Sequence, residues 1–208
     1  MNDVKFWNKI AEGYDKSSYS TYADAYKRTI EKTKKYLNPE MTVLDIGCGT
    51  GIITNEIAED IKRIDAIDYS EKMIAEAEAK AAKKEIKNVT YSVKSIAEIK
   101  GTNIKYDCIT AFNVLYFIKD IDEMLDNINS ILETDGLFIS VTDCFGEKTT
   151  IKTVMTKILQ KTGIVPSMKF YSVKGLREKI TGKGFEIIGE ESLYNNPPNY
   201  FIAARKIK

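Results

Sequence analysis

The chain has 208 residues, a net charge of +1 and 43% apolar residues. This size and composition predict one globular domain, residues 1–208, with a core of its own, and the neutral balance gives no charge-driven attraction to nucleic acid or acidic membrane. Histidine is absent, which excludes Ser-His and Cys-His nucleophilic sites and removes the commonest metal ligand.

The cysteines and the N-terminal residues indicate the cellular compartment of the protein and whether it binds a metal. Cys48, Cys108 and Cys144 are too scattered for a disulfide framework, and their spacing matches no metal site. The first residues lack the apolar stretch of a signal peptide, and no apolar run is long enough to cross a bilayer. We therefore expect a cytoplasmic protein without a bound metal and without a membrane partner, whereas composition predicts no oligomeric state.

The N-terminal region is predicted to be helical. Residues 3–37 carry apolar and aromatic side chains at helical spacing, with a break expected around residues 13–20. Pro39 ends the region, because proline disfavours helix in the residue before it. We expect residues 1–38 to form a helical cap on the domain.

The next segment carries the most informative motif of the chain. Residues 42–46 form an apolar strand that ends in Asp45-Ile46, and Gly47-Cys48-Gly49-Thr50-Gly51 then leads into an expected helix at 52–60. Glycine accepts positive φ and lets a ligand lie against the main chain. The N–H groups at a helix start point toward such a ligand, so we expect a nucleoside-like cofactor.

Asp45 to Gly51 resembles the first motif of class I S-adenosylmethionine-dependent methyltransferases. The dinucleotide fingerprint G-x-G-x-x-G is the alternative, and Ile52 stands where its last glycine would fall. The resemblance is strong over residues 40–142 and loose elsewhere. It implies S-adenosyl-L-methionine as cofactor and an α/β fold, a Rossmann-like doubly wound sheet of seven strands in the order 3-2-1-4-5-7-6 with the last strand antiparallel.

Apolar strands and helices alternate after this motif. Further strands are expected at residues 63–68, 89–93, 106–112 and 137–141, and Ser70 and Asp120 are expected to cap helices that run to about Lys84 and Leu132. Repeated βα units with apolar strands predict a parallel sheet covered by helices on both faces.

The pattern changes near the end of the chain. Residues 147–161 predict an amphipathic helix, Ser172 begins another that ends near Gly182, and strands at 185–190 and 200–206 form a hairpin around the loop 195–199. The resemblance implies that residues 146–182 form a substrate-side helical insertion. Four side chains are expected to form its apolar pocket wall: Met155, Leu159, Met168 and Phe170.

Two further patterns in this region have alternative interpretations. Lys148, Lys152 and Lys157 form a basic stripe, which is either a solvated face or a site for a substrate carboxylate. Asn196-Pro197-Pro198-Asn199-Tyr200 resembles the Asn-Pro-Pro-Tyr signature of enzymes that methylate amino groups of nucleic acids. It lies after the wrong strand and carries an extra residue, so an ordinary turn is favoured.

The resemblance implies a set of cofactor-binding residues. Asp45 binds the ammonium group of the cofactor or caps its own turn, and the glycine turn from Gly47 to Gly51 forms the floor. Asp68 accepts hydrogen bonds from the ribose hydroxyls or acts as a helix N-terminal acid. The remaining expected contacts are Tyr14, Tyr22, Cys48, Gly49, Tyr69, Ser95, Ile96, Ala111 and Asn113; Ser95 stands where the family usually has an acid.

The absence of histidine restricts the catalytic chemistry. An amine, thiol, enolate or carboxylate acceptor needs no enzymic base, whereas for a hydroxyl acceptor the candidate bases are Tyr14, Tyr116 and Asp143. The aromatic N-terminus, including Phe6, Trp7 and Tyr19, resembles the opening segment of ubiquinone and menaquinone methyltransferases, where it covers the cofactor; core packing is the alternative.

We therefore expect transfer of a methyl group to a small-molecule acceptor by in-line displacement, with no nucleic-acid partner. A protein or RNA methyltransferase and a non-catalytic cofactor-binding module are the alternatives.

Overall fold

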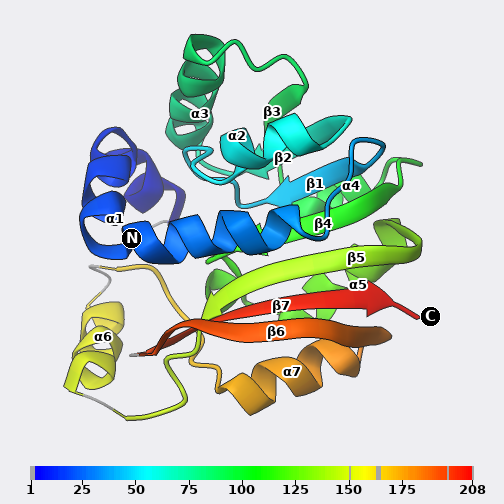
Figure 1. Ribbon diagram of the computed structural model, residues 1–208. Helices are drawn as coiled ribbons and strands as arrows, with labels where there is room; N and C mark the ends of the chain where they lie inside the picture. Colours follow the sequence, from blue (N-terminus) through cyan, green and yellow to red (C-terminus); the bar gives the residue numbers. More distant parts are fainter. Residues whose placement is uncertain (1–2, 150, 163–164, 196, 208) are drawn as a thin grey trace.

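The computed structural model describes residues 3–149, 151–162, 165–195 and 197–207. Its centre is a seven-stranded sheet in the order β3-β2-β1-β4-β5-β7-β6 (Figure 1). Only β7 runs antiparallel to its neighbours β5 and β6. The strands are β1 (Thr42–Ile46), β2 (Arg63–Asp68), β3 (Val89–Val93), β4 (Tyr106–Phe112), β5 (Leu132–Asp143), β6 (Phe185–Asn195) and β7 (Pro198–Lys206). The predicted fold and strand order are confirmed.

Helices cover both faces of this sheet. The helices are α1 (Asp3–Lys34), α2 (Thr54–Ile57), α3 (Glu71–Lys83), α4 (Ile96–Lys100), α5 (Ile121–Ile131), α6 (Ile151–Lys161) and α7 (Val173–Thr181), with short 3-10 helices η1 (Ala58–Asp60) and η2 (Leu115–Phe117). Side chains alternate between faces along a strand. Val43 therefore packs with Ile57 of α2 on one face, while Leu44 packs in the cluster that contains Leu125 of α5 and Leu176 of α7.

Three helices begin at the residues that the sequence indicates. The side chains of Ser70, Asp120 and Ser172 accept hydrogen bonds from main-chain N–H groups three residues further on, at 3.2, 3.0 and 3.0 Å. Each of these caps contributes about 1 kcal/mol to stability. They fix the starts of α3, α5 and α7.

The expected break of the N-terminal helix at residues 13–20 is wrong. The helix continues through this segment and is kinked at Tyr22, where φ is −129° and ψ is 19°. Ser20 Oγ donates to the Ser17 carbonyl at 2.8 Å, and Thr21 Oγ1 donates to it at 3.4 Å. Such hydroxyl bonds to the preceding turn bend helices. The N-terminal turns of α1 therefore lie at the carboxyl edge of the sheet, at the left in Figure 1.

Two expected helices are shorter in the structure. The segment 52–60 divides into α2 and η1, and the helix expected from residue 147 begins at Ile151. The Glu147 side chain instead accepts from the Val173 N–H at 2.8 Å, at the start of α7. Glu147 therefore bonds to the start of α7 and does not belong to α6.

The last three strands are longer than expected. β5 begins at Leu132, which pairs with Tyr106 of β4. Asp135 adopts a φ of +60° inside the strand, and the pairing with β4 shifts between Tyr106 and Cys108. β6 and β7 extend to the pair Asn195–Pro198, and the register shifts twice along this hairpin. The expected loop 195–199 is therefore mostly strand, and its residue Asn196 lies outside the described residues. Within the described part of the chain, every helix is too short or too polar to cross a membrane.

Candidate functional site

The glycine turn after β1 contains three residues in the left-handed region. Gly47, Gly49 and Gly51 have φ values of +68°, +54° and +74°. A Cβ on Gly47 would lie 2.6 Å from the Val114 side chain, and one on Gly51 would lie 2.6 Å from Tyr91 Oη, whereas a Cβ on Gly49 would meet nothing within 4 Å. Packing therefore requires Gly47 and Gly51, and Gly49 faces the open cleft. Gly51 faces Tyr91 rather than the floor of the cleft, contrary to expectation.

Asp68 closes β2 beside this turn. One carboxylate oxygen accepts from the Gly49 N–H at 3.1 Å, and the other accepts from the Ser70 N–H at 2.8 Å. Burial raises the pKa of Asp68, and the N–H donors partly oppose that rise. Asp68 lines a cleft together with Trp7, Tyr69 and other residues. It is therefore both an acid at a helix start and a wall of the cleft.

Asp45 lies beneath the turn and is almost fully buried. Its two carboxylate oxygens accept from the hydroxyls of Thr54 at 2.6 Å and Thr110 at 2.7 Å. Burial raises the pKa of Asp45 to about 6, and the two hydroxyl donors lower it. Asp45 lines the second half of the cleft with Gly47, Cys48 and Gly49. A nearby cation would stabilise the ionised form of Asp45.

The N-terminal part of α1 covers this cleft. Asp15 accepts from Thr50 Oγ1 at 2.5 Å and pairs with Lys80 of α3, and Asn8 Oδ1 accepts from Ser70 Oγ at 2.6 Å. These bonds join α1 to both βα junctions. Trp7 packs edge-on against Phe117 at 5.1 Å and Tyr14 at 6.3 Å, and also contacts Phe6. The aromatic residues are thus packed and at the same time form a roof.

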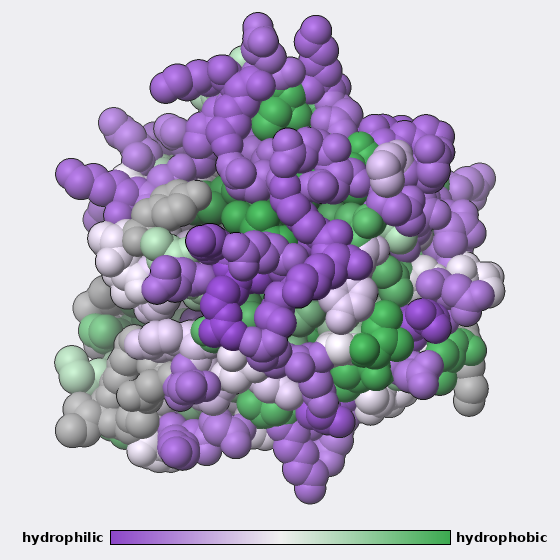
Figure 2. Space-filling view, in the orientation of Figure 1, coloured by the Kyte–Doolittle hydropathy of each residue, from purple (hydrophilic) through white to green (hydrophobic). Residues whose placement is uncertain are grey.

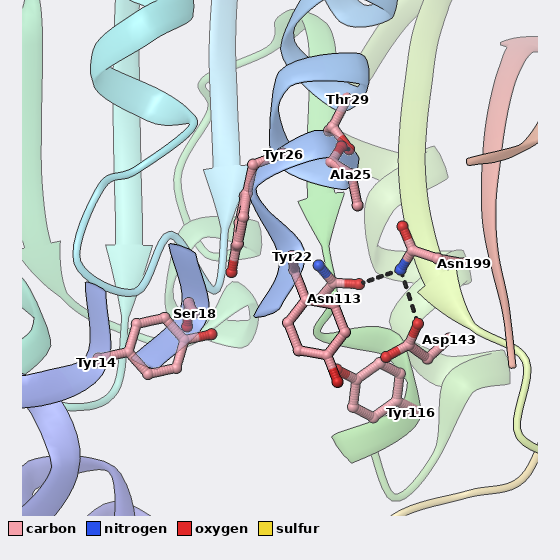
Figure 3. A pocket seen from close by; sticks show the side chains of 10 residues that line it. All are labelled: Tyr14, Ser18, Tyr22, Ala25, Tyr26, Thr29, Asn113, Tyr116, Asp143 and Asn199. Carbon is pink, nitrogen blue, oxygen red and sulfur yellow. Dashed lines mark hydrogen bonds between the residues drawn. The ribbon is translucent and has the colours of Figure 1, made fainter. Parts of the chain in front are cut away.

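A cavity of about 180 Å³ adjoins the cleft (Figure 3). Asn199 of β7 holds two of its lining side chains together, because its Nδ2 donates to Asn113 Oδ1 at 3.0 Å and to Asp143 Oδ1 at 2.8 Å. Asn113, Tyr14 and Tyr26 also line the cleft. The described residues that line it are Tyr14, Ser18, Tyr22, Ala25, Tyr26, Thr29, Asn113, Tyr116, Asp143 and Asn199.

The sequence interpretation missed Asn199 and Tyr26 as residues of this cavity. Asn199 pairs in register with Asp143 at the ends of β7 and β5. The sequence does show that both residues are polar and lie at strand ends. That they face each other depends on the register of β7 against β5, which the sequence alone does not give. Tyr26 lies one turn beyond the kink at Tyr22. The kink sets the direction of the Tyr26 side chain, and the sequence did not predict a kink at that residue.

Asn113 lies at the junction of the cleft and the cavity. Its φ is +56°, and its N–H donates to the Val141 carbonyl at 2.7 Å. Left-handed backbone outside glycine is uncommon and often marks functional sites. The turn directs the Asn113 side chain toward Asn199, between the ends of β4 and β7.

Several expected site residues lie elsewhere. Ser95 caps α4, where its N–H and its hydroxyl both bond Glu98 Oε2, and Ile96 packs against the core. Ala111 is fully buried in β4. The cavities formed by the described residues near the glycine turn include none of the three. A short helix at 96–100, which the sequence interpretation missed, explains the position of Ser95.

The expected apolar wall from α6 is also wrong. Met155 is 58% exposed and Leu159 is 36% exposed. In Figure 2 a few green atoms are visible beside grey ones at the lower left, where Figure 1 places α6. Phe170 packs on Phe145 at 5.9 Å, and Lys157 Nζ lies 4.9 Å from the Phe170 ring. Met168 is absent from the lining of the described cavity, and the Lys152 side chain lies outside the described part.

Over residues 37–181, the chain matches the family described as a methyltransferase domain. The chain belongs to this methyltransferase family. It is 28% identical over 140 residues to the malonyl-[acyl-carrier protein] O-methyltransferase of Bacillus cereus, covering 64% of this chain and 50% of that protein. The chain thus spans about half the length of the first curated relatives it matches.

Two solved structures share the fold of this chain. The magnesium protoporphyrin IX methyltransferase of Synechocystis PCC 6803 with bound SAH is similar with a TM-score of 0.74 and 19% identity, covering 99% of this chain and 100% of that one. The DhpI–SAH complex is similar with a TM-score of 0.76 and 18% identity, covering 99% and 95%. At these identities the likeness shows the fold. Family membership confirms the predicted resemblance, which implies S-adenosylmethionine as the cofactor.

The residues of the cleft fit this cofactor. The space beside Gly49, which a Cβ would enter, lies between the carboxylates of Asp45 and Asp68. One carboxylate suits an ammonium group and the other suits paired hydroxyls. The chain therefore carries acceptor groups at both ends of the cleft and an open main-chain surface between them.

Proposed function

We propose that this protein transfers a methyl group from S-adenosylmethionine to a small-molecule acceptor by in-line displacement. The bound cofactor supplies a methyl group that its sulfonium makes electrophilic. The observation that carries the proposal is the cavity beside Asn113, which adjoins the cleft and is closed by tyrosine side chains. A cavity of about 180 Å³ suits a small group or molecule better than a folded macromolecule.

The cofactor is held by the walls of the cleft. Asp45 takes the ammonium group, Asp68 takes the ribose hydroxyls, and Gly49 exposes main chain to the ligand. The roof contributes Tyr14, and Tyr69 flanks the adenine. The proposed set is Tyr14, Asp45, Gly47, Cys48, Gly49, Asp68, Tyr69 and Asn113. Tyr22 belongs to the acceptor cavity, and Ser95, Ile96 and Ala111 are left out because they line none of the cavities that the described residues form near the glycine turn.

The chain's own residues position the acceptor and exclude water from it. Orientation of reacting groups supplies roughly 7–11 kcal/mol of a barrier in favourable cases. Burial holds the pKa of Tyr116 well above its ordinary value, so its hydroxyl stays protonated and is unsuited to act as a base. Among the three expected candidates, Asp143 is the one that carries a carboxyl group rather than a phenol, and carboxylates commonly serve as general bases.

We also propose one domain over residues 1–208, with a cap at 1–38 and an acceptor-side segment at 146–182. The Lys169 N–H donates to the Tyr116 carbonyl at 2.6 Å, and the Gly146 N–H donates to the Tyr171 carbonyl at 2.8 Å. These bonds fasten the segment behind the acceptor cavity. Its influence on the acceptor is therefore exerted through Tyr116, rather than through the exposed face of α6.

Transfer of radiolabelled methyl groups tests this function. The protein is incubated with methyl-labelled S-adenosylmethionine and, separately, with a metabolite extract, bulk protein and bulk RNA. Label in the metabolite fraction supports the proposal. Label confined to protein or RNA indicates a macromolecular methyltransferase, and binding of S-adenosylhomocysteine without any transfer indicates a non-catalytic module.

A further inference from the structure

We infer that α6 is a docking helix that lies on an anionic lipid surface, with its apolar face toward the acyl chains and the neighbouring lysines among the head groups. This inference goes beyond the proposed methyl transfer and concerns a different surface of the molecule. Two observations carry it. The helix turns apolar side chains outward, and it lies in a lysine-rich stretch of the chain that has no acidic residue.

The outward face of α6 is apolar. Four side chains of this helix are 36–58% exposed, namely Val154, Met155, Ile158 and Leu159. They share one side of the helix, because residues three and four positions apart are neighbours on a helix surface. Thr153, in contrast, is 4% exposed, and Thr156 and Gln160 are half-buried. α6 therefore directs its apolar residues outward and its uncharged polar residues toward the protein, which is the reverse of an ordinary surface helix.

The stretch around α6 is basic, although the chain as a whole is nearly neutral. Residues 148–169 contain five lysines and no aspartate or glutamate, whereas the net charge of the whole chain is +1. Lys148, Lys157 and Lys169 are exposed. Lys157 follows Val154 by three positions and so lies at the border of the apolar face. The expected absence of a membrane partner depends partly on the net charge of the whole chain, which conceals this local excess.

The interface of a bilayer accommodates both features. Amphipathic helices rich in lysine lie in the plane of the membrane, with the apolar side chains buried roughly 5–10 Å into the boundary between head groups and acyl chains. Lysine stems extend along such a boundary while their ammonium groups stay in the polar layer. Each lysine near an anionic surface strengthens binding about fivefold. An anionic lipid surface therefore contacts the apolar face and the lysines at the same time.

Other occupants fit this surface less well. A second copy of the chain would bring the same lysines against this segment, and like charges repel. Nucleic acid would pair with the lysines but leave the four apolar side chains facing phosphates and water. An acidic polypeptide would match the charge alone. The experiment distinguishes all three from a lipid surface.

The position of α6 relates this surface to the acceptor side of the molecule. α6 follows β5 beyond the carboxyl edge of the sheet, at the left margin in Figure 1. After α6, the Lys169 N–H donates to the Tyr116 carbonyl at 2.6 Å. Docking through α6 would therefore bring the acceptor side to the lipid surface without using a residue that lines the acceptor cavity.

Flotation of the full chain with lipid vesicles tests the inference. The probes are vesicles of phosphatidylcholine alone and vesicles of a roughly 2:1 mixture of phosphatidylcholine and phosphatidylglycerol. We expect at least about tenfold stronger binding to the anionic vesicles, and weaker binding as salt is raised, because salt screens the lysines. Ile158→Asp should weaken binding at least about tenfold, since a carboxylate replaces an exposed apolar side chain. Ile104→Asp makes the same change at an isoleucine that is 41% exposed before β4, at the opposite edge of the sheet, and should bind as the wild type does.

A second pair of variants measures the contribution of charge. Lys157→Gln should weaken binding to the anionic vesicles about fivefold and leave binding to the neutral vesicles unchanged. Lys62→Gln removes an exposed lysine just before β2 and should change neither value.

Absence of flotation by the wild type, or equal binding to neutral and anionic vesicles, would overturn the inference even if a variant failed to fold. Flotation of folded Ile158→Asp at the wild-type level would also overturn it. A dimer that Ile158→Asp dissociates, or binding of bulk RNA or polyglutamate, each without flotation, would assign the surface to another partner. Cofactor binding and methyl transfer play no part in these readouts, so failure of the proposed function is seen separately.

Discussion

The carboxylate of Asp68, at the end of β2, accepts a hydrogen bond from the main-chain N–H of Gly49 at 3.1 Å. Two residues 19 positions apart in the chain thus join the turn after β1 to the turn after β2. The bond exists because parallel neighbouring strands bring their carboxyl ends to the same edge of the sheet. It places an acceptor group for hydroxyls directly beside the exposed main chain of the cleft.

Replacing Asp68 should weaken cofactor binding. Asp68→Ala removes a charged acceptor, and such hydrogen bonds contribute about 1.5–3 kcal/mol, so affinity for S-adenosylhomocysteine should fall roughly ten- to hundredfold. Calorimetry measures the change. Glu71→Ala removes an exposed acid from the first turn of α3 and serves as the matched control. Undiminished binding by folded Asp68→Ala would refute the assignment of Asp68.

Replacing Gly47 by alanine and replacing Gly49 by alanine should have different effects on stability and on cofactor binding. Gly47→Ala places a Cβ 2.6 Å from Val114, whereas Gly49→Ala meets no protein atom within 4 Å. Both variants lose about 1–2 kcal/mol of stability from positive φ, and Gly47→Ala should lose more because of the clash. Gly49→Ala should instead lose cofactor affinity beyond its stability loss. Thermal unfolding and calorimetry separate the two effects, and Val114→Ala should partly rescue Gly47→Ala only.

Cofactor binding should depend on pH through Asp45. Burial raises the pKa of Asp45 to about 6, so its carboxyl is largely protonated at pH 5 and ionised at pH 7. A cofactor ammonium favours the ionised form, so affinity for S-adenosylhomocysteine should be about tenfold weaker at pH 5 than at pH 7. Asp45→Asn should bind weakly with a flatter profile. A wild-type affinity that is constant over this range would contradict the role of Asp45.

The raised pKa of Asp45 should also make the free energy of unfolding depend on pH. The folded protein holds a proton on Asp45 up to about pH 6, whereas the unfolded chain releases it near the ordinary value of 3.8. The folded state therefore binds more protons between these values, and the Asp45 contribution to the free energy of unfolding should decrease as pH rises from about 4 to 6. Denaturant unfolding of the ligand-free wild type and Asp45→Asn measures the difference, which should level off above pH 6.

Activity should depend on the side chain of Asn113 rather than on its left-handed backbone conformation. Asn113→Gly relieves the strain at a φ of +56° and should leave stability nearly unchanged, but it removes the acceptor for Asn199. We expect at least about a tenfold loss in kcat/KM, because the Asp143 carboxylate is no longer oriented. Glu85→Gly relieves the same φ at the end of α3 and is the control. Equal activity of both variants would contradict this role.

The sheet could be predicted because its signals are local. β1 to β4 match their predicted bounds, since each is a short run that contains β-branched or aromatic residues and is followed by a turn or loop. The caps at Ser70, Asp120 and Ser172 also depend on residues three positions apart. The order of the last two strands came from the family resemblance, because strand pairing is a tertiary property.

The acceptor side could be predicted only in part. Asp143 and Asn113 were recognised from their positions after strands, but their partner Asn199 lies 56 and 86 residues away and depends on the register of β7 against β5. The kink at Tyr22 arises from weak hydroxyl bonds around Ser17, which no periodicity reveals. The apolar face of α6 resembled a pocket wall, and its orientation could not be read from spacing alone.

A crystal structure of the protein with S-adenosylhomocysteine tests the central claim most directly. The account predicts ribose hydroxyls on Asp68, the homocysteine amine near Asp45, and the sulfur facing the cavity between Asn113 and Asp143. The ligand bound elsewhere, or bound in the cleft with its sulfur directed away from that cavity, would contradict the account.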